Sequence, residues 1–463
     1  MTRRRVQPAV GAGQGAQLPG LPRGVRPYDW ALAQLRVCRA HAITRGAAEV
    51  VVAVIDLGYR HHPDLEGHLW RPPGARRGAP GWDCADDDAS LEYRGPGART
   101  SAYFRGHHVF VAGEVAAMAP CCPIMIVRVA YGQPASWAGG IRWAVAHGAR
   151  VLVIPHDYIA GEASTGTPRF YQGTDFAYPD DNPDLIAAMR EAGERGCLIV
   201  KGTADNRGRC VASATAALSM VLAVGSANRR GEPADICASA AYVAVGAPAG
   251  QRDVPPRRGA IWGCGGDRDY VPFTGGCMAS GFAGGVAALV WSRFPWLGQQ
   301  QLRQVLQNTA RPARGVVPDA DGWDPRLGYG LLDAGRAVSL HPERLPPAVR
   351  LRAATVRVRR SAGRWRLEAR LRNRGALDAE RVLVVAFDGD PTRPADPRGT
   401  LAAPAAPLQT RQLGHTIARV RGLHETAIAI ALVQPPPATV WLETCCLEPA
   451  TPAPVHRTRV RRR

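Results

Sequence analysis

Four residue types that together perform acyl transfer stand at points of the chain where reactive side chains are expected. Asp56 ends the apolar run VVVAVID, and His107 lies near the start of GHHVFVAGEVAA. Asn206 lies in TADNRG, directly after the apolar run GCLIVKG, and Cys277 opens the small-residue run in FTGGCMASGFAGG. A carboxylate that orients an imidazole, a nucleophile that gives this imidazole its proton, and an amide that stabilises an oxyanion form the constellation of covalent acyl transfer.

Cys277 is the residue on which this chemistry depends. The Gly-Gly pair before it and the apolar residues after it place the thiol at the first turn of an expected buried helix. A helix N-terminus and a nearby histidine both lower the pKa of a thiol, which favours a reactive thiolate. The sequence leaves open whether Cys277 is a nucleophile, a replacement of serine by mutation, or a small thiol that fills the place of a lost serine.

The elements that would hold these residues follow an alternating pattern. Five continuous apolar runs are typical of strands buried on both faces: 50–56, 123–130, 149–155, 196–202 and 219–227. Amphipathic stretches at 137–148 and 184–196 predict helices between them. Such alternation predicts an α/β fold with a parallel sheet covered on both faces. Asp56 and Asn206 would then lie at the carboxyl ends of their strands, where ligands bind in open parallel sheets.

The pattern changes after a proline-containing stretch. Beyond it, TVRVRRSAGRWRLEARLRN alternates apolar and charged residues around a turn, as a hairpin with one solvated face does. We expect five segments: a disordered basic tail at 1–25, a catalytic-type domain at 26–340, a linker at 341–349, a small antiparallel β-sandwich at 350–455 and a basic tail at 456–463.

The basic charge is uneven and consists almost entirely of arginine. The 463 residues carry a net charge of +19, and Lys201 is the single lysine among 58 basic residues. Residues 350–463 hold 21 arginines against 9 acidic residues. An arginine stripe of this kind can contact nucleic acid, but it is more often the solvated face of a strand. We therefore rank a nucleic-acid partner third.

Composition also bears on location and cofactors. No stretch of about 20 apolar residues is present, so no membrane span is expected. The N-terminus lacks the apolar centre of a secretory signal, and a cytoplasmic location is the default. The 11 cysteines include the pairs Cys121–Cys122 and Cys445–Cys446, which lack the spacing of a zinc site. We expect no metal and no cofactor, and we interpret the acidic stretch 83–90 as a solvated loop rather than a calcium site.

Four segments, in this order, resemble motifs of the subtilase (subtilisin-like) family. VAVIDLGYRHHPDL is similar to VAVIDTGVDxxHPDL, and GHHVFVAGEVAA is similar to GHGTHVAGxIAA. TADNRG falls on AAGNxG, and FTGGCMAS falls on xSGTSMAS. LRQVLQNTARP and LGYGLLDAGRAV also look like the closing helices of the family, so that the resemblance covers about residues 28–340.

The resemblance implies a subtilisin-like fold and a role for each matching residue. Asp56 would orient His107, which would activate Cys277 at the position of the nucleophilic serine, and Asn206 would bind the oxyanion. The neighbouring backbone would line the substrate: Pro155, His156, Gly275 and Gly276. The C-terminal segment weakly resembles the immunoglobulin-like modules appended to many bacterial subtilases, which suggests docking of a substrate or partner.

The chain departs from the family pattern at several places. Cysteine replaces the serine, His108–Val109 replaces Gly-Thr after the catalytic histidine, and Gly281 replaces a proline. Pro155 stands where the family has a serine on the strand that lines the substrate. Because proline has no N–H to donate to an extended peptide, substrate binding must differ from strand addition.

Two functions of different classes remain. The first is a peptidase in which Cys277 attacks a peptide bond and hydrolyses or transfers it. Transfer is included because the thioester intermediate favours attack by amines more than an ester does. The alternative is an inactive pseudoprotease that binds a peptide or protein partner.

Overall fold

The structure is a computed structural model that divides into two compact units, Met1–Ser339 and Leu340–Arg463. It describes residues 21–461 apart from 23, 73–78, 95–101, 157–175, 178–181, 320, 346, 348, 362, 388–411, 434, 438 and 447–455. The expected N-terminal tail therefore lies almost entirely outside the described residues.

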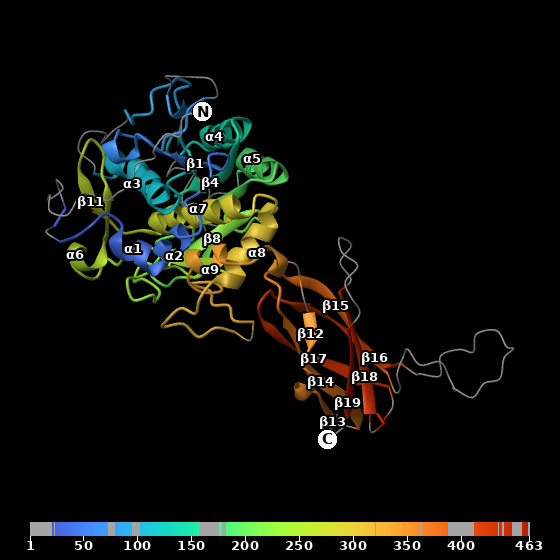
Figure 1. Ribbon diagram of the computed structural model, residues 1–463. Coiled ribbons are helices and arrows are strands. Elements are labelled where there is room, and N and C mark those ends of the chain that lie inside the picture. The colour runs from blue at the N-terminus through green and yellow to red at the C-terminus, as the bar shows by residue number, and fades with distance from the viewer. Residues whose placement is uncertain are drawn as a thin grey trace. The chain divides into compact units, whose positions relative to one another are not determined.

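A seven-stranded parallel sheet forms the centre of the first unit (Figure 1). All five apolar runs are strands of this sheet, and each is buried along nearly its whole length because helices cover both faces. In spatial order the strands are β2 (Gly81–Asp83), β3 (Ile124–Arg128), β1 (Val51–Asp56), β4 (Ala149–Ile154), β6 (Leu198–Gly202), β8 (Val221–Ala227) and β9 (Val245–Pro248).

Two pairs of helices cover the sheet. Helices α4 (Pro134–Ala146) and α5 (Pro183–Glu194) share one apolar cluster with alternate residues of β1, β3 and β4. They confirm the two helices expected between the five apolar runs, since α4 lies between β3 and β4 in the chain and α5 lies between β4 and β6. Helices α3 (Ala102–Met118) and α7 (Gly276–Arg293) pack against each other, and α3 also contacts β1 and β3 while α7 contacts β4, β6 and β8. Figure 1 shows α7 running through the middle of this unit.

Shorter elements surround this frame. They are α1 (Asp29–Gln34), α2 (Val37–His41), the 3₁₀ turn η1 (Pro63–Leu65), β5 (Phe176–Ala177), β7 (Val211–Ala212), α6 (Pro256–Gly259), β10 (Ile261–Cys264), β11 (Tyr270–Phe273), α8 (Gln299–Thr309) and α9 (Ala334–Val338). The antiparallel hairpin β10–β11 leads directly into α7. It therefore fixes where the first turn of α7 begins.

Helices α3 and α7 approach closely at glycines. A Cβ atom on Gly285 would lie 2.4 Å from the Cβ of Met118, and one on Gly281 would lie 2.0 Å from Oε2 of Glu114. Glu114 is fully buried, and neither of its carboxyl oxygens meets a hydrogen-bonding partner among the residues described. Gly281, which replaces the proline of the family motif, thus leaves room for a glutamate between the two helices.

The second unit consists of two antiparallel sheets around one apolar core. Its elements are η2 (Pro342–Arg344), β12 (Val349–Leu351), η3 (Ala353–Thr355), β13 (Arg357–Ser361), β14 (Arg364–Asn373), β15 (Ala379–Phe387), β16 (Gln412–Val420), β17 (Glu425–Leu432), β18 (Thr439–Cys446) and β19 (His456–Arg461). The stretch expected as a basic tail at 456–463 instead contains β19, which pairs with β18. Strand pairing satisfies its backbone, which the charge of the side chains alone does not reveal.

Replacing the buried acid by its neutral isostere tests the packing between α3 and α7. Burial raises the pKa of Glu114 well above its ordinary value of 4.5, so the folded protein holds the carboxyl neutral. The contribution of Glu114 to the free energy of unfolding is fully present below pH 4.5. As the pH rises from there toward the folded-state pKa, this free energy falls by about 1.4 kcal/mol per pH unit. We expect Glu114→Gln to be more stable than the parent at neutral pH, by a margin that grows with pH. Urea unfolding of both proteins from pH 4 upward measures this margin, and a margin independent of pH would show that Glu114 is ionised when folded.

Candidate active site

The carboxylate of Asp56 lies between two imidazoles. Asp56 is the last residue of β1 and is 1% exposed. Nδ1 of His107, on α3, donates to Oδ2 at 2.7 Å, and Nε2 of His156 donates to Oδ1 at 2.7 Å. The Leu57 N–H also donates to Oδ1, at 2.6 Å. The structure therefore brings together Asp56 and His107 as expected from their order in the sequence.

These contacts set the ionisation of the cluster. Burial by itself would raise the pKa of Asp56, but the charges and hydrogen bonds of His107 and His156 outweigh it and hold this pKa well below its usual range. Burial lowers the pKa of His156, although the Asp56 carboxylate acts in the opposite direction. The arrangement at neutral pH is one carboxylate that accepts hydrogen bonds from two buried rings.

His108, the neighbour of His107, has a different partner. Its Nε2 lies 3.0 Å from the carbonyl oxygen of Val54, and its ring packs edge-on against Tyr59. Burial lowers the pKa of His108 to about 4, so the ring is neutral at physiological pH. His108 therefore ties α3 to β1 and does not contact the carboxylate.

His156 makes a contact that the sequence did not predict. The residue follows β4 and is expected, with Pro155, to line the substrate; in the structure it is 5% exposed and its ring donates to Asp56. The side chain of Lys201, on β6, is fully buried and donates to the carbonyl oxygen of His156. The single lysine of the chain thus supports the segment that carries the second imidazole.

Cys277 is the second residue of α7 and is half-buried. The hairpin strand before the helix ends at Phe273, whose ring packs edge-on against His107 with centroids 5.9 Å apart. The chain between Phe273 and the first residue of α7 is held in place because the Gly275 N–H donates to the Ala249 carbonyl at 2.9 Å. The first turn of α7 is closed by Ser280, whose hydroxyl donates to the Cys277 carbonyl at 2.6 Å.

An aspartate beside the expected amide contacts the start of α7. The Gly276 N–H donates to Oδ1 of Asp205 at 2.7 Å, and the Arg252 guanidinium donates to Oδ2. Burial raises the pKa of Asp205, while Arg252 and the Gly276 N–H lower it. Sequence analysis missed Asp205, although TADNRG contains it next to Asn206.

The backbone of this loop explains why Asp205 points to the helix. Ala204 and Arg207 have left-handed φ values of 98° and 43°, which residues with a Cβ rarely adopt. The chain therefore turns sharply on both sides of Asp205 and Asn206. Asn206 is half-buried, and its carbonyl oxygen accepts the Arg209 N–H at 2.9 Å.

The Asp56 cluster has the composition of a metal site. One ligand atom from each of Asp56, His107 and His156 lies within 4.8 Å of the others. In the present geometry both imidazole nitrogens that face the carboxylate are used in hydrogen bonds to it. The cluster thus has the hydrogen-bonding pattern of a proton-transfer site.

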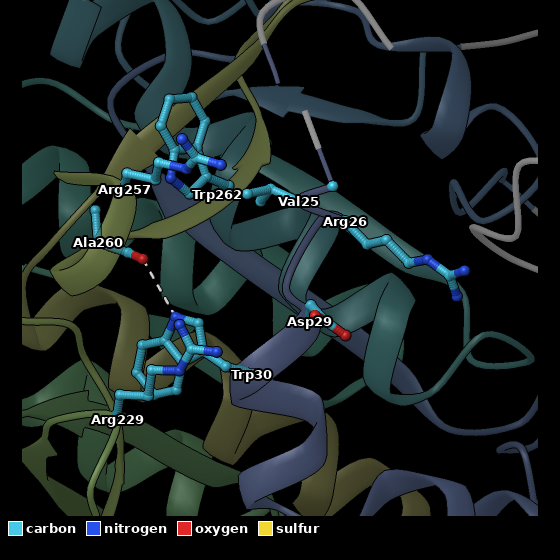
Figure 2. Close-up of a pocket in the computed structure, with 9 residues that line it drawn as sticks. Val25, Arg26, Asp29, Trp30, Arg229, Arg257, Ala260 and Trp262 are labelled. Atoms are coloured by element: carbon cyan, nitrogen blue, oxygen red, sulfur yellow. Dashed lines mark hydrogen bonds between the residues drawn. The ribbon is translucent and has the colours of Figure 1, made fainter. Parts of the chain in front are cut away.

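A basic and aromatic pocket of about 230 Å³ lies elsewhere on the first unit (Figure 2). Trp30 and Trp262 line it together with Arg26, Arg229 and Arg257. Figure 2 shows Trp30 donating to the carbonyl oxygen of Ala260, at 3.2 Å. None of the residues that line this pocket belongs to the Asp56 cluster, so the pocket is separate from the Asp56–His107 contact.

Within the described part of the chain, no helix is both long enough and apolar enough to cross a membrane.

Comparison with known proteins identifies the family. The subtilase family model matches residues 47–330, which is more than half of the chain and includes Asp56, His107 and Cys277. The chain belongs to the subtilase family.

Curated subtilases match at low identity. A thermostable alkaline protease of Halalkalibacterium halodurans is 26% identical over 321 residues, which are 66% of this chain and 73% of that protein. Fervidolysin of Fervidobacterium pennivorans is 26% identical over 361 residues, or 69% of this chain and 46% of its own length. This chain thus spans less than half of the second relative.

Solved structures share the fold. The crystal structure of a lanthipeptide protease has a TM-score of 0.52 at 21% identity and covers 67% of this chain and 93% of its own. A subtilisin-like fold with a seven-stranded parallel sheet is therefore established for the first unit of this subtilase.

Two substitutions of His156 test the second imidazole. His156→Phe removes the donor to a buried carboxylate, and we expect a loss of about 1.5–3 kcal/mol in the free energy of unfolding at neutral pH. His156→Gln keeps an N–H donor on a side chain of similar reach and should recover part of this loss. Because the folded-state pKa of His156 lies below 6.5 and that of Asp56 below 3.8, the advantage of histidine should decrease as the pH falls below 6.5. Urea unfolding at several pH values measures it. Equal stability of all three proteins would show that the contact is unimportant.

Proposed function

We propose that this subtilase is a thiol peptidase, in which Cys277 attacks a peptide bond and forms a thioester. The observation that carries the proposal is the buried Asp56–His107 contact at 2.7 Å on the helix that packs against α7. A carboxylate on Nδ1 fixes the tautomer of the ring, so that Nε2 is the nitrogen that exchanges a proton with a nucleophile. The family match over residues 47–330 supports this reaction class.

The catalytic steps use groups of this chain only. His107 takes the thiol proton at Nε2 while its Nδ1–H remains on Asp56, and the Cys277 sulfur bonds to the carbonyl carbon of the substrate. His107 then returns the proton to the leaving amine. Water or a second amine attacks the thioester and releases Cys277, which gives hydrolysis or peptide transfer. His156 holds the other oxygen of Asp56 and acts as a positioning residue.

The nucleophile lies at the N-terminal end of an 18-residue helix. The partial positive charge of this end stabilises a thiolate and, later, an oxyanion. We place the oxyanion against the Cys277 N–H and the Asn206 amide. Peptides and unfolded protein segments are the substrates, and the C-terminal unit, with its antiparallel sheets, docks a substrate or partner.

One observation favours the alternative, a pseudoprotease that binds peptides without turnover. The Asp205 carboxylate accepts the Gly276 N–H, one residue before Cys277. If the carboxylate is ionised, its negative charge opposes an oxyanion formed nearby. Catalysis at neutral pH then depends on Arg252 neutralising Asp205.

Alkylation separates the nucleophile from a space-filling thiol. We expect iodoacetamide to modify Cys277 at neutral pH faster than Cys38, an exposed thiol of the same chain that serves as an internal reference. His107→Ala should slow the modification of Cys277 and leave that of Cys38 unchanged. Peptide mass spectrometry reads both rates in one sample, and a slow reaction at Cys277 that does not depend on His107 indicates the pseudoprotease.

A peptide-library digest under reducing conditions then tests turnover itself. Cleaved or newly joined peptides that vanish in Cys277→Ala establish the thiol peptidase and reveal its specificity. Identical spectra of the two proteins reject it.

Substitutions at two neighbouring residues assign the oxyanion group. We expect Asn206→Ala to lower kcat/KM by about 10²–10³, as loss of a side-chain donor does in related chemistry. Asp205→Asn removes the negative charge and should raise kcat/KM at neutral pH, with less effect in acid. Steady-state hydrolysis of a peptide found in the library digest measures both. A loss with Asp205→Asn and none with Asn206→Ala would assign the role to Asp205.

A further inference from the structure

A second cluster of potential ligands lies outside the Asp56–His107–His156 group. His62 and Asp64 belong to the turn at η1, and Cys264 ends β10. One ligand atom of each lies within 4.8 Å of the other two. An imidazole, a carboxylate and a thiol at this separation offer the N, O and S donors that zinc prefers.

Two polar atoms, one in this cluster and one beside it, are buried without partners at hydrogen-bonding geometry in the described part of the chain. His62 and Cys264 are each 1% exposed. Nε2 of His62 meets no partner at hydrogen-bonding geometry among the described residues, although the backbone of Asp269 lies near the ring. Burial lowers the pKa of His62. The Tyr59 hydroxyl is likewise buried and meets no partner at hydrogen-bonding geometry among the described residues, although the backbone of His62 lies near it. A buried polar group without a hydrogen-bonding partner destabilises the folded state, and two such groups at one place indicate a missing polar occupant.

The surrounding residues hold two of the ligands in place. The Tyr270 hydroxyl donates to Oδ2 of Asp64 at 2.6 Å, which leaves Oδ1 for another contact. The Cys264 N–H donates to the Tyr28 hydroxyl at 3.0 Å, and that hydroxyl donates to the Phe110 carbonyl. Hydrogen bonds of this kind orient the ligands of protein metal sites.

We propose that His62, Asp64 and Cys264 bind a divalent transition-metal ion of the zinc type, with solvent or the Tyr59 hydroxyl as the fourth ligand. Nε2 of His62 is the binding nitrogen. The proton of the ring then moves to Nδ1, which gives up the long contact of 3.2 Å with the Asp64 N–H. The thiol proton of Cys264 leaves to solvent, because thiolate is the form that binds metal.

The ion would connect two segments that carry the Asp56 cluster and the nucleophile. The turn at η1 follows Asp56 by a few residues, and the hairpin β10–β11 ends at Phe273, which contacts His107. Metal binding at His62 and Cys264 would therefore fix the distance between the segment after the carboxylate and the segment before Cys277. The binding itself does not depend on whether the protein is a peptidase.

Cobalt is the probe, because a thiolate ligand gives Co²⁺ an intense charge-transfer band in the near ultraviolet. The full chain is stripped of metal with a chelator under reducing conditions and titrated with Co²⁺. We expect one equivalent to produce the band and one equivalent of Zn²⁺ to remove it. The band should be lost in Cys264→Ser and reduced in His62→Gln and Asp64→Asn.

Two other cysteines provide matched controls. Cys237 is also 1% exposed, and burial raises its pKa to about 12, as it does for Cys264. Cys237 belongs to neither ligand cluster found among the described residues, so Cys237→Ser should keep the band. Cys277→Ser should keep it too.

Three results overturn the proposal: no band in the parent protein, a band that survives Cys264→Ser, or a band lost in Cys277→Ser alone. The last would make Cys277 the thiolate ligand and place the ion there rather than at Cys264. Circular dichroism checks that each variant is folded. If Cys264→Ser is not folded, loss of the band in folded His62→Gln supports the site and its full retention overturns it.

Discussion

The buried carboxylate of Asp56 is the constraint on which the rest of the candidate site depends. A carboxylate that is 1% exposed is stable only if hydrogen bonds replace its hydration. Two imidazoles and one backbone N–H supply them, each within 2.7 Å. The end of β1 therefore determines where α3 and the segment after β4 must lie, since each contributes one of the rings. The single lysine of the chain stabilises the second of these segments through the carbonyl oxygen of His156.

The contact between α3 and α7 joins the helix that carries His107 to the helix that carries Cys277, the proposed nucleophile. Glycines at the crossing allow the helices to approach, and Gly281 leaves space for the buried Glu114. Such an acid, without a partner in the described structure, lowers stability at neutral pH. Natural proteins accept local costs of this kind most often near functional sites. The hairpin β10–β11 adds the contact of Phe273 with His107 and thereby positions the first turn of α7.

The surroundings of Cys277 combine features that favour and oppose catalysis. The helix N-terminus favours a thiolate, while the Asp205 carboxylate on the Gly276 N–H brings negative charge to the same place. Arg252 offsets that charge through its ion pair with Asp205. In the proposed mechanism, the balance between these charges distinguishes a peptidase from a binding protein.

The sequence by itself determined the frame of this protein. Continuous apolar runs identified the buried strands β1, β3, β4, β6 and β8, because a parallel sheet covered on both faces needs apolar residues at every position. The motifs placed Asp56, His107 and Cys277 at the ends of elements in the order of the subtilase family, which the family match includes. The sequence did not show which of two neighbouring residues contacts the site, as with Asp205 and Asn206. A local pattern predicts the helix or strand, but it does not predict the direction of a side chain at the end of that element.

Only the tertiary structure decided those directions. It directs the ring of His156 to Asp56, and the left-handed φ of Ala204 turns the chain so that Asp205 contacts the start of α7. It paired the arginine-rich end of the chain as β19. It also brought Cys264 to His62 and Asp64 from about 200 positions away in the sequence. The physical reason is common to all four: loop geometry and long-range packing fix these contacts, and neither leaves a period or a spacing in the sequence.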